Sequence, residues 1–163
     1  MNIWKTVQQL SLRQLVELSI LLLQKPLYIL PTLKATRSTL KTCNRLYNKK
    51  HNANGRSNAF RHALWTLLIC RYIFTVSRNE EKSVFWAKKI TDLHEKLAPN
   101  APLDMAMDLH NNSVGLFYFR RSRDHLEEEI IAFIQQKAQQ AIKISSVDGL
   151  EEHKETLVYI SEI

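Results

Sequence analysis

Apolar residues recur every three or four positions along most of this chain, and that spacing predicts helices rather than strands. The expected helices cover residues 1–33 with a break at Lys25-Pro26, then 35–47, 57–77, 79–97, 104–121 and 124–144. The segment 58–77 is apolar nearly all round, with residues such as Leu64, Leu67 and Ile73. A helix without a polar face is covered by other helices, so we expect this one at the centre of a bundle of about six.

The scarcity of turn residues supports an all-α fold. The 163 residues include 3 glycines and 4 prolines, too few for the many turns of a β-sandwich or barrel. A chain of this length can bury one hydrophobic core. We therefore predict a single helical domain over residues 1–163.

Three regions of this domain differ in character. They are a basic amphipathic helical region at 1–50, a motif-bearing core at 54–121 and a charged C-terminal tail at 150–163. Within the tail, the apolar run 157–160 is expected to pair or dock. Ser57 or Asn58 is expected to cap the central helix, and Asn79 the next one, because their side chains accept backbone N–H groups.

The net charge of +7 conceals a strong asymmetry. Residues 1–78 hold 13 Lys and Arg against one acid, a charge of +12, whereas residues 79–163 hold 10 against 15 acids, a charge of −5. A basic surface attracts an anionic small molecule, a lipid headgroup, an acidic protein or a nucleic acid, or it is simply solvated. Nucleic acid is disfavoured, because the basic residues are spread over several helices and no nucleic-acid-binding motif accompanies them.

No transmembrane segment or signal peptide is predicted. The apolar run 20–23 is far shorter than the roughly 20 residues of a spanning helix, and Glu17 and Lys25 flank it. No small-x-small cleavage site follows. We expect a cytoplasmic protein or one peripheral to a membrane, with the first amphipathic helix either packed on the core or lying on lipid.

No cysteine or serine nucleophile is indicated. Cys43 and Cys70 lie in apolar helical stretches without a C-x-x-C pair, so they are predicted to be buried thiols rather than metal ligands or a disulfide. Ser113 lies in no nucleophile motif. Nucleophilic catalysis is therefore the least supported chemistry.

Three short polar segments interrupt otherwise apolar helices, at residues 58–65, 92–95 and 108–115. The third belongs to a stripe at steps of three and four residues, made of Asp104, Asp108, Asn111, Asn112 and Gly115. A helix places residues of this spacing on one face. A face of short acidic and amide side chains can hold a polar group.

These segments contain the patterns R-H-A-x-W at 61–65, D-x-H-E at 92–95 and N-N-x-x-G at 111–115. In this order they resemble an uncharacterised all-helical bacterial family with the same patterns. The likeness covers roughly residues 54–115, with Leu93 where a smaller residue is expected. Such domains also resemble those appended to secreted polymorphic toxins, which implies an enzymatic effector without implying a particular reaction.

The polar segments supply donors for a divalent transition metal. Zinc, manganese and iron accept imidazole and carboxylate ligands, and the candidates are His62, Asp92, His94 and Asp108. The candidate catalytic residues are Arg61, His62, Glu95, Asn111 and Asn112. Arginine can neutralise an oxyanion, a carboxylate can act as general base, and an amide can orient water or a phosphate.

Two functions remain open. The first is metal-assisted hydrolysis of a phosphoester or other anionic group, which needs about three metal ligands and an open position. It requires His62, His94 and Asp108 to converge. The alternative is a non-enzymatic module in which these residues form a structural hydrogen-bond network, as polar side chains in helix bundles commonly do. In that case the basic first half binds an anionic membrane surface or nucleic acid.

Overall fold

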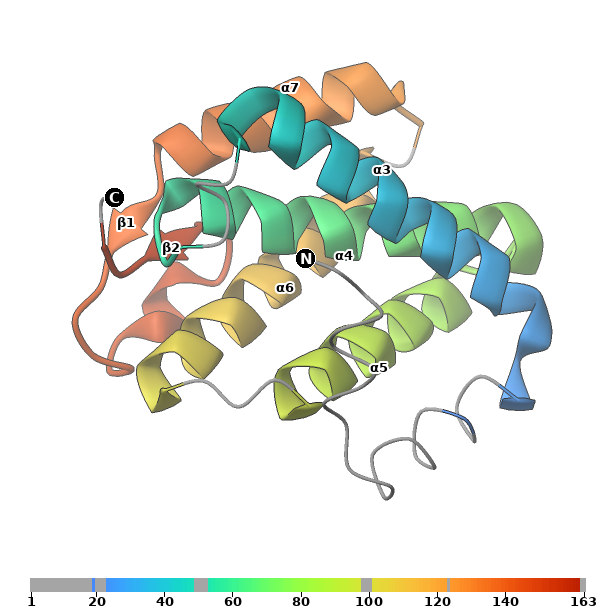
Figure 1. Ribbon diagram of the computed structural model, residues 1–163, viewed down its shortest axis with the longest axis horizontal. Coiled ribbons are helices and arrows are strands. Elements are labelled where there is room, and N and C mark those ends of the chain that lie inside the picture. Colours follow the sequence, from blue (N-terminus) through green and yellow to red (C-terminus); the bar gives the residue numbers. More distant parts are fainter. Residues whose placement is uncertain (1–18, 20–22, 49–52, 98–100, 123, 162–163) are drawn as a thin grey trace.

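The computed structural model describes residues 19, 23–48, 53–97, 101–122 and 124–161, and the five α-helices of this part confirm the all-α fold (Figure 1). They are α3 (Ile29–Tyr47), α4 (Arg56–Ser77), α5 (Glu80–Leu97), α6 (Pro102–Ser122) and α7 (Glu127–Gln139). Each expected helix from residue 35 onward has a counterpart, although α3 begins and α7 ends earlier than expected. Most of the first expected segment lies outside the described residues, and the break at Pro26 coincides with the 3-10 helix η1 (Pro26–Tyr28).

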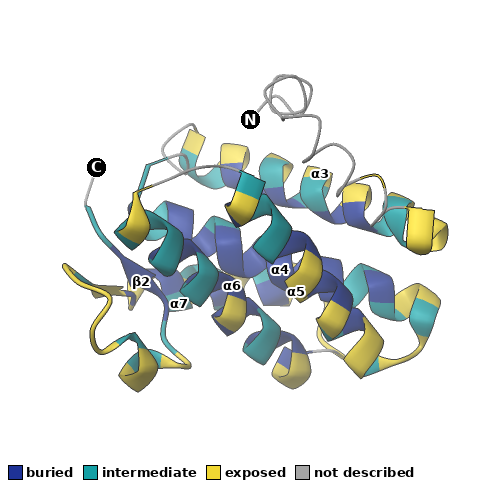
Figure 2. Cartoon of the chain, turned by 90° about the horizontal axis from the view of Figure 1, so that it is seen from below, coloured by how far each residue is buried: buried dark blue, intermediate teal, exposed yellow. Residues whose placement is uncertain are grey.

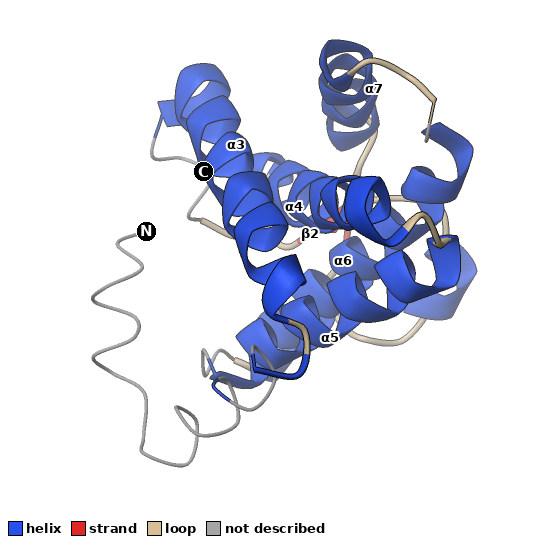
Figure 3. Ribbon diagram, turned by 90° about the vertical axis from the view of Figure 1, so that its right-hand side faces the viewer, coloured by secondary structure: helices blue, strands red, loops and turns tan. Residues whose placement is uncertain are grey.

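The apolar helix α4 is central, as its sequence predicts. It packs against α3, α5, α6 and α7. In Figure 1, α3 and α7 lie above it and α5 and α6 below it. Most of its residues are buried (Figure 2), and the view along the molecule shows other helices around it (Figure 3).

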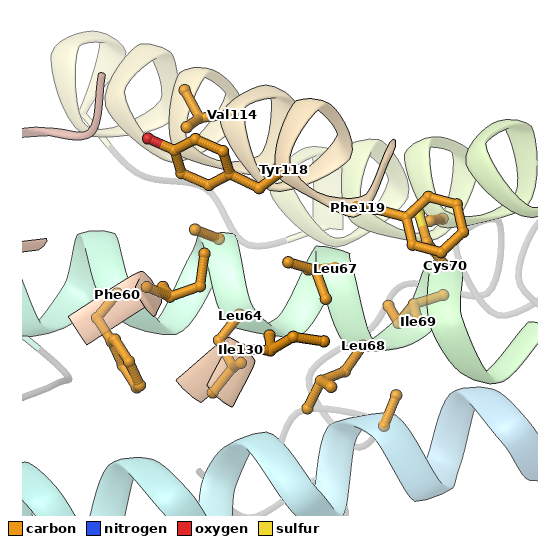
Figure 4. Packing of buried hydrophobic residues seen from close by; sticks show 14 of the residues in the cluster. Phe60, Leu64, Leu67, Leu68, Ile69, Cys70, Val114, Tyr118, Phe119 and Ile130 are labelled. Carbon is orange, nitrogen blue, oxygen red and sulfur yellow. The ribbon is translucent and has the colours of Figure 1, made fainter. Parts of the chain in front are cut away.

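The hydrophobic core surrounds α4 (Figure 4). Leu64, Leu67 and Leu68 are fully buried there, and Phe119 of α6 and Ile130 of α7 belong to the same cluster. Burying an apolar side chain of this size contributes roughly 1.5–3 kcal/mol. This packing sets the rotation of α4 about its axis, and with it the direction of the polar side chains in its first turns.

The C-terminal residues add a small parallel sheet. Strand β1 (Ile142–Lys143) pairs with β2 (Val158–Tyr159), and the 3-10 helix η3 (Leu150–His153) lies between them in the chain. Both residues of β2 are buried. The expectation that the run 157–160 pairs or docks is therefore confirmed.

The helix ends show one expected cap and one unexpected one. Asn79 caps α5, because its Oδ1 accepts a hydrogen bond from the Lys82 backbone N–H at 2.8 Å. The prediction of Ser57 or Asn58 as cap of α4 is wrong, since Gly55 occupies that position without a side-chain bond. The Asn58 side chain is used elsewhere, in a hydrogen bond to Asp108.

Gly115 lets α6 approach α4 closely. A Cβ at this position would lie 2.5 Å from the Ala63 carbonyl oxygen and 3.0 Å from the Thr66 Cβ. A side chain at this position would force α4 and α6 apart, so glycine is favoured here. The close approach brings Asn112, about one turn earlier on α6, against α4.

The two thiols are free and buried, as predicted. Burial raises the pKa of both, that of Cys43 to about 12, so neither is a nucleophile at neutral pH. Ser113 is exposed and donates to the Leu109 carbonyl oxygen at 3.0 Å. In the described part of the chain, every helix is too short or too polar to cross a bilayer.

Candidate functional site

Six polar side chains from three helices meet on one side of α4. This polar cluster consists of Asn58, Arg61 and His62 of α4, Glu95 of α5, and Asp108 and Asn112 of α6. The three residues of α4 share a face because Arg61 and His62 follow Asn58 by three and four positions, about one helical turn. All members except Arg61, which is half-buried, are shielded from solvent.

His62 lies at the middle of the cluster. Its Nδ1 is 3.3 Å from Asn112 Oδ1 and 3.5 Å from Glu95 Oε1. Its Nε2 is 3.2 Å from Asp108 Oδ1 and 2.9 Å from Arg61 Nη2. Each ring nitrogen therefore faces one carboxyl group, and the imidazole connects α5 to α6.

Asn112 holds the three helices in this arrangement. Its Oδ1 accepts from the Thr66 hydroxyl at 3.0 Å and faces His62, both on α4. Its Nδ2 donates to Glu95 Oε1 on α5 at 3.3 Å. Asn112 therefore orients both His62 and Glu95.

Asn58 orients Asp108 and Arg61 at the other end of the cluster. Its Nδ2 donates to Asp108 Oδ1 at 2.8 Å, and its Oδ1 accepts from Arg61 Nη2 at 2.5 Å. Arg61 is thereby directed at His62 and Asp108. A half-buried guanidinium held this way stabilises negative charge that develops beside it.

The hydrogen bonds of His62 indicate that one proton can be exchanged between His62 and Asp108. Arg61 only donates, so His62 Nε2 accepts from it and a neutral ring carries its proton on Nδ1. Asp108 Oδ1 then faces the same Nε2 lone pair, an unfavourable contact unless a proton lies between them. The His62–Asp108 contact is therefore a place where a proton can be bound and released.

Burial shifts the pKa values of these groups toward their neutral forms. Desolvation, reinforced by the Asp108 charge, raises the pKa of Glu95 to about 7. Desolvation also raises the pKa of Asp108 to about 6, against the opposing effect of Arg61. The pKa of His62 is lowered well below its usual value, first by burial and then by Arg61. His62 is accordingly neutral, so its contacts with the two carboxyl groups are not ion pairs.

A cavity of about 30 Å³ lies between α3, α4 and α5. Its lining consists of Thr36, Thr39 and Leu40 of α3, Arg61, His62 and Trp65 of α4, and His94 of α5. A space of this size holds one or two water molecules. Because Arg61 and His62 belong to both the cavity and the polar cluster, a group entering the cavity meets the cluster directly.

Three residues singled out in the sequence lie apart from the cluster's hydrogen bonds. The Asp92 side chain is 43% exposed and pairs with Lys88 at 2.6 Å on the surface of α5. Asn111 is used by β2, where it accepts from the Val158 backbone N–H and donates to its carbonyl oxygen, both at 2.9 Å. His94 lines the cavity with its ring 5.1 Å from that of Trp65, edge to face.

Some residues of the site escaped sequence reasoning. Thr66 lies one helical turn after His62, so its spacing was a usable signal. Thr36, Thr39 and Leu40 offered none, since they reach the cavity only through the packing of α3 on α4.

The donor set suits a divalent transition metal in its chemistry. One ligand atom each from His62, Glu95 and Asp108 lie within 4.8 Å of one another. Ligand atoms about a zinc ion lie closer, since each sits about 2 Å from the metal, so the side chains would have to draw together. Arg61 Nη2 already bonds His62 Nε2 and the ring proton is on Nδ1, so binding a metal would require His62 to give up one of the two.

A family model, described as a domain of unknown function (DUF6973), matches residues 19–142, a span that includes all three polar segments. No curated protein and no solved structure matches the chain. The expected membership of an uncharacterised family is thereby confirmed, while the resemblance to toxin-appended domains stays a prediction. With more than half of its length matched, the chain belongs to the DUF6973 family, whose function is unknown.

Proposed function

We propose that the chain is a hydrolase whose proton transfers are carried out by His62, Glu95 and Asp108. The observation that supports this most directly is their burial together beside a cavity, with each carboxyl group facing one ring nitrogen of the histidine. The pKa values of about 7 for Glu95 and about 6 for Asp108 suit proton exchange near neutral pH.

The energetic cost of this cluster argues against a purely structural role. Replacing buried ionic groups by apolar residues of similar volume is often neutral or stabilising by about 1–4 kcal/mol. The rest of α4 is packed by apolar side chains. Groups with strongly shifted pKa values next to a cavity are typical of catalytic sites.

The roles follow from the contacts. His62 lines the cavity, so the proton of the attacking water reaches Glu95, hydrogen-bonded by Asn112, through the imidazole, and the His62–Asp108 pair returns one to the leaving group. Arg61 stabilises the negative charge that develops on the substrate. The substrate enters through the cavity, which both Arg61 and His62 line.

A metal ion is compatible with the same residues. His62, Glu95 and Asp108 would hold it, and when bound it would lower the pKa of a coordinated water. Elemental analysis of protein purified without chelator tests this directly. Stoichiometric zinc, manganese or iron that is lost in His62→Ala supports a metal-dependent reaction, and metal-free active protein excludes one.

The hydrolase is tested with a panel of p-nitrophenyl phosphates, phosphodiesters and carboxylic esters. Glu95→Gln should lower the rate on the accepted substrate by about 100-fold or more, the usual worth of a general base. Asp92→Asn is the matched control, a carboxyl on the same helix that faces solvent, and its rate should not change. Equal rates in both variants, or no turnover of any substrate class, would favour a structural network.

A second function is supported by the surface of α3. Lys34, Arg37, Lys41 and Arg45 are exposed, and this helix contains no acidic residue. The exposed Leu27 and Leu30 lie near its start. A basic face beside exposed apolar side chains suits an anionic membrane surface.

A further inference from the structure

The hydroxyl of Thr39 is buried without a partner. Thr39 is 1% exposed, its Oγ1 makes no hydrogen bond, and the residue lines the cavity. Leaving a buried hydroxyl unbonded costs about 1–3 kcal/mol. The neighbouring Thr36 differs, because its hydroxyl donates to the Thr32 carbonyl oxygen and accepts from Trp65 Nε1, each at 2.9 Å. The unmet hydrogen bond of Thr39 points to a group that enters the cavity.

The other polar groups of the cavity favour a negatively charged occupant. Arg61 is the only lining residue with a formal charge at neutral pH when the histidines are neutral, and its charge is positive. Neither Glu95 nor Asp108 lines the cavity. A guanidinium and a hydroxyl are both donors to oxyanions, and a neutral imidazole supplies one more N–H.

We propose that the cavity is a binding subsite for one oxyanion group of the substrate, a phosphoryl or carboxylate group, with Thr39 and His94 as ligands in addition to Arg61. This inference rests on the proposed function and names its substrate class. The volume of about 30 Å³, room for one or two water molecules, admits one or two oxygen atoms of such a group. Leu40 and Trp65 form the apolar part of the wall, so the rest of the substrate remains outside.

The subsite is tested by calorimetric titration of the whole chain with inorganic phosphate and, separately, with acetate. Thr39→Val removes the hydroxyl and keeps the shape, and should weaken binding of the preferred anion about tenfold, the equivalent of one hydrogen bond of 1.4 kcal/mol. Thr42→Val is the control, a buried threonine of the same helix outside the cavity, and should bind as the wild type does. Phosphate binding identifies a phosphoryl subsite, and acetate binding a carboxylate subsite.

The stability of the same variants separates a ligand role from a structural one. Because Thr39 makes no hydrogen bond, Thr39→Val should keep or raise the melting temperature in anion-free buffer. Binding of neither anion, or equal binding by Thr39→Val and wild type, would overturn the subsite and leave a water-filled cavity.

Different results would refute the anion subsite and the hydrolase. Asp92→Asn should bind the anion as the wild type does, since this carboxyl lies at the surface and does not line the cavity. Anion binding without turnover of any ester would refute the hydrolase and keep the subsite. Turnover of neutral esters without anion binding would refute the subsite and keep the hydrolase.

Discussion

The protonation of Glu95 depends on its buried surroundings. Its pKa rises from 4.5 to about 7 on folding because the carboxyl group is buried beside Asp108. Between these values the folded chain holds a proton that the unfolded chain has lost, so stability falls as pH rises through this window. The neutral His62 acts in the opposite direction below its ordinary value of 6.5. The effect of Glu95 on the pH dependence of stability is therefore measured best by comparing a Glu95 variant with the wild type.

We expect Glu95→Gln to gain stability relative to the wild type as pH rises from 5 to 8. Glutamine keeps the oxygen that accepts from Asn112 and cannot ionise. One pKa unit corresponds to about 1.4 kcal/mol, so the relative gain is at most a few kcal/mol. Urea unfolding of both proteins at the two pH values measures it. A difference that is constant with pH, or that moves the other way, would show that Glu95 is ionised in the folded protein.

The sequence did not predict which of two neighbouring polar side chains on a helix faces the cluster. Asn111 and Asn112 are adjacent and chemically identical, yet one binds β2 and the other holds His62 and Glu95. Adjacent residues of a helix point about 100° apart, and only the packed position of α6 decides which faces the cluster. The same holds on α5, where Glu95 faces the cluster and Asp92 faces solvent.

At the scale of elements, the helices were predictable and their mutual placement was not. Periodicity identified each described α-helix and the central place of α4. The approach of α3 that forms the cavity depends on contacts between distant parts of the chain. The pairing of β1 with β2 joins segments too short to be recognised by alternation.

Gly115 is the element-scale determinant of the site. We expect Gly115→Ala to destabilise the fold by about 1–3 kcal/mol, the usual cost of overpacking, although alanine by itself favours a helix by about 1 kcal/mol. The added methyl group pushes α6 away from the Ala63 carbonyl oxygen, and so moves Asn112 away from His62. Chemical denaturation measures the loss. Ser113→Ala, at an exposed position of the same helix, is the control. A Gly115→Ala protein as stable as the control would mean that α6 is not held by this contact.

At the scale of the whole molecule, charge is distributed unevenly. The first 78 residues carry +12 and the remainder −5, and α3 places four basic side chains on the surface. If this face binds anionic membranes, Arg37→Glu with Lys41→Glu should abolish binding to phosphatidylserine vesicles. Lys82→Glu with Lys89→Glu, two exposed lysines of α5, should reduce it less.

Salt provides the second criterion for this surface. Attraction between exposed charges is screened over about 10 Å at 0.1 M ionic strength, so vesicle binding should weaken steeply as salt is added. Sedimentation with vesicles at two salt concentrations measures both effects. Equal loss in the two double variants, or binding that does not respond to salt, would leave the basic face as a solvated surface.

The most direct test of the central claim is a carbon-detected NMR titration of the Glu95 side chain, assigned with Glu95→Gln. A proton-exchanging cluster predicts that this carboxyl titrates with an apparent pKa near 7, coupled to Asp108 near 6. An ion pair with a charged His62 predicts a pKa at or below the ordinary 4.5. The higher value would support acid–base chemistry at this site, and the lower one would contradict it.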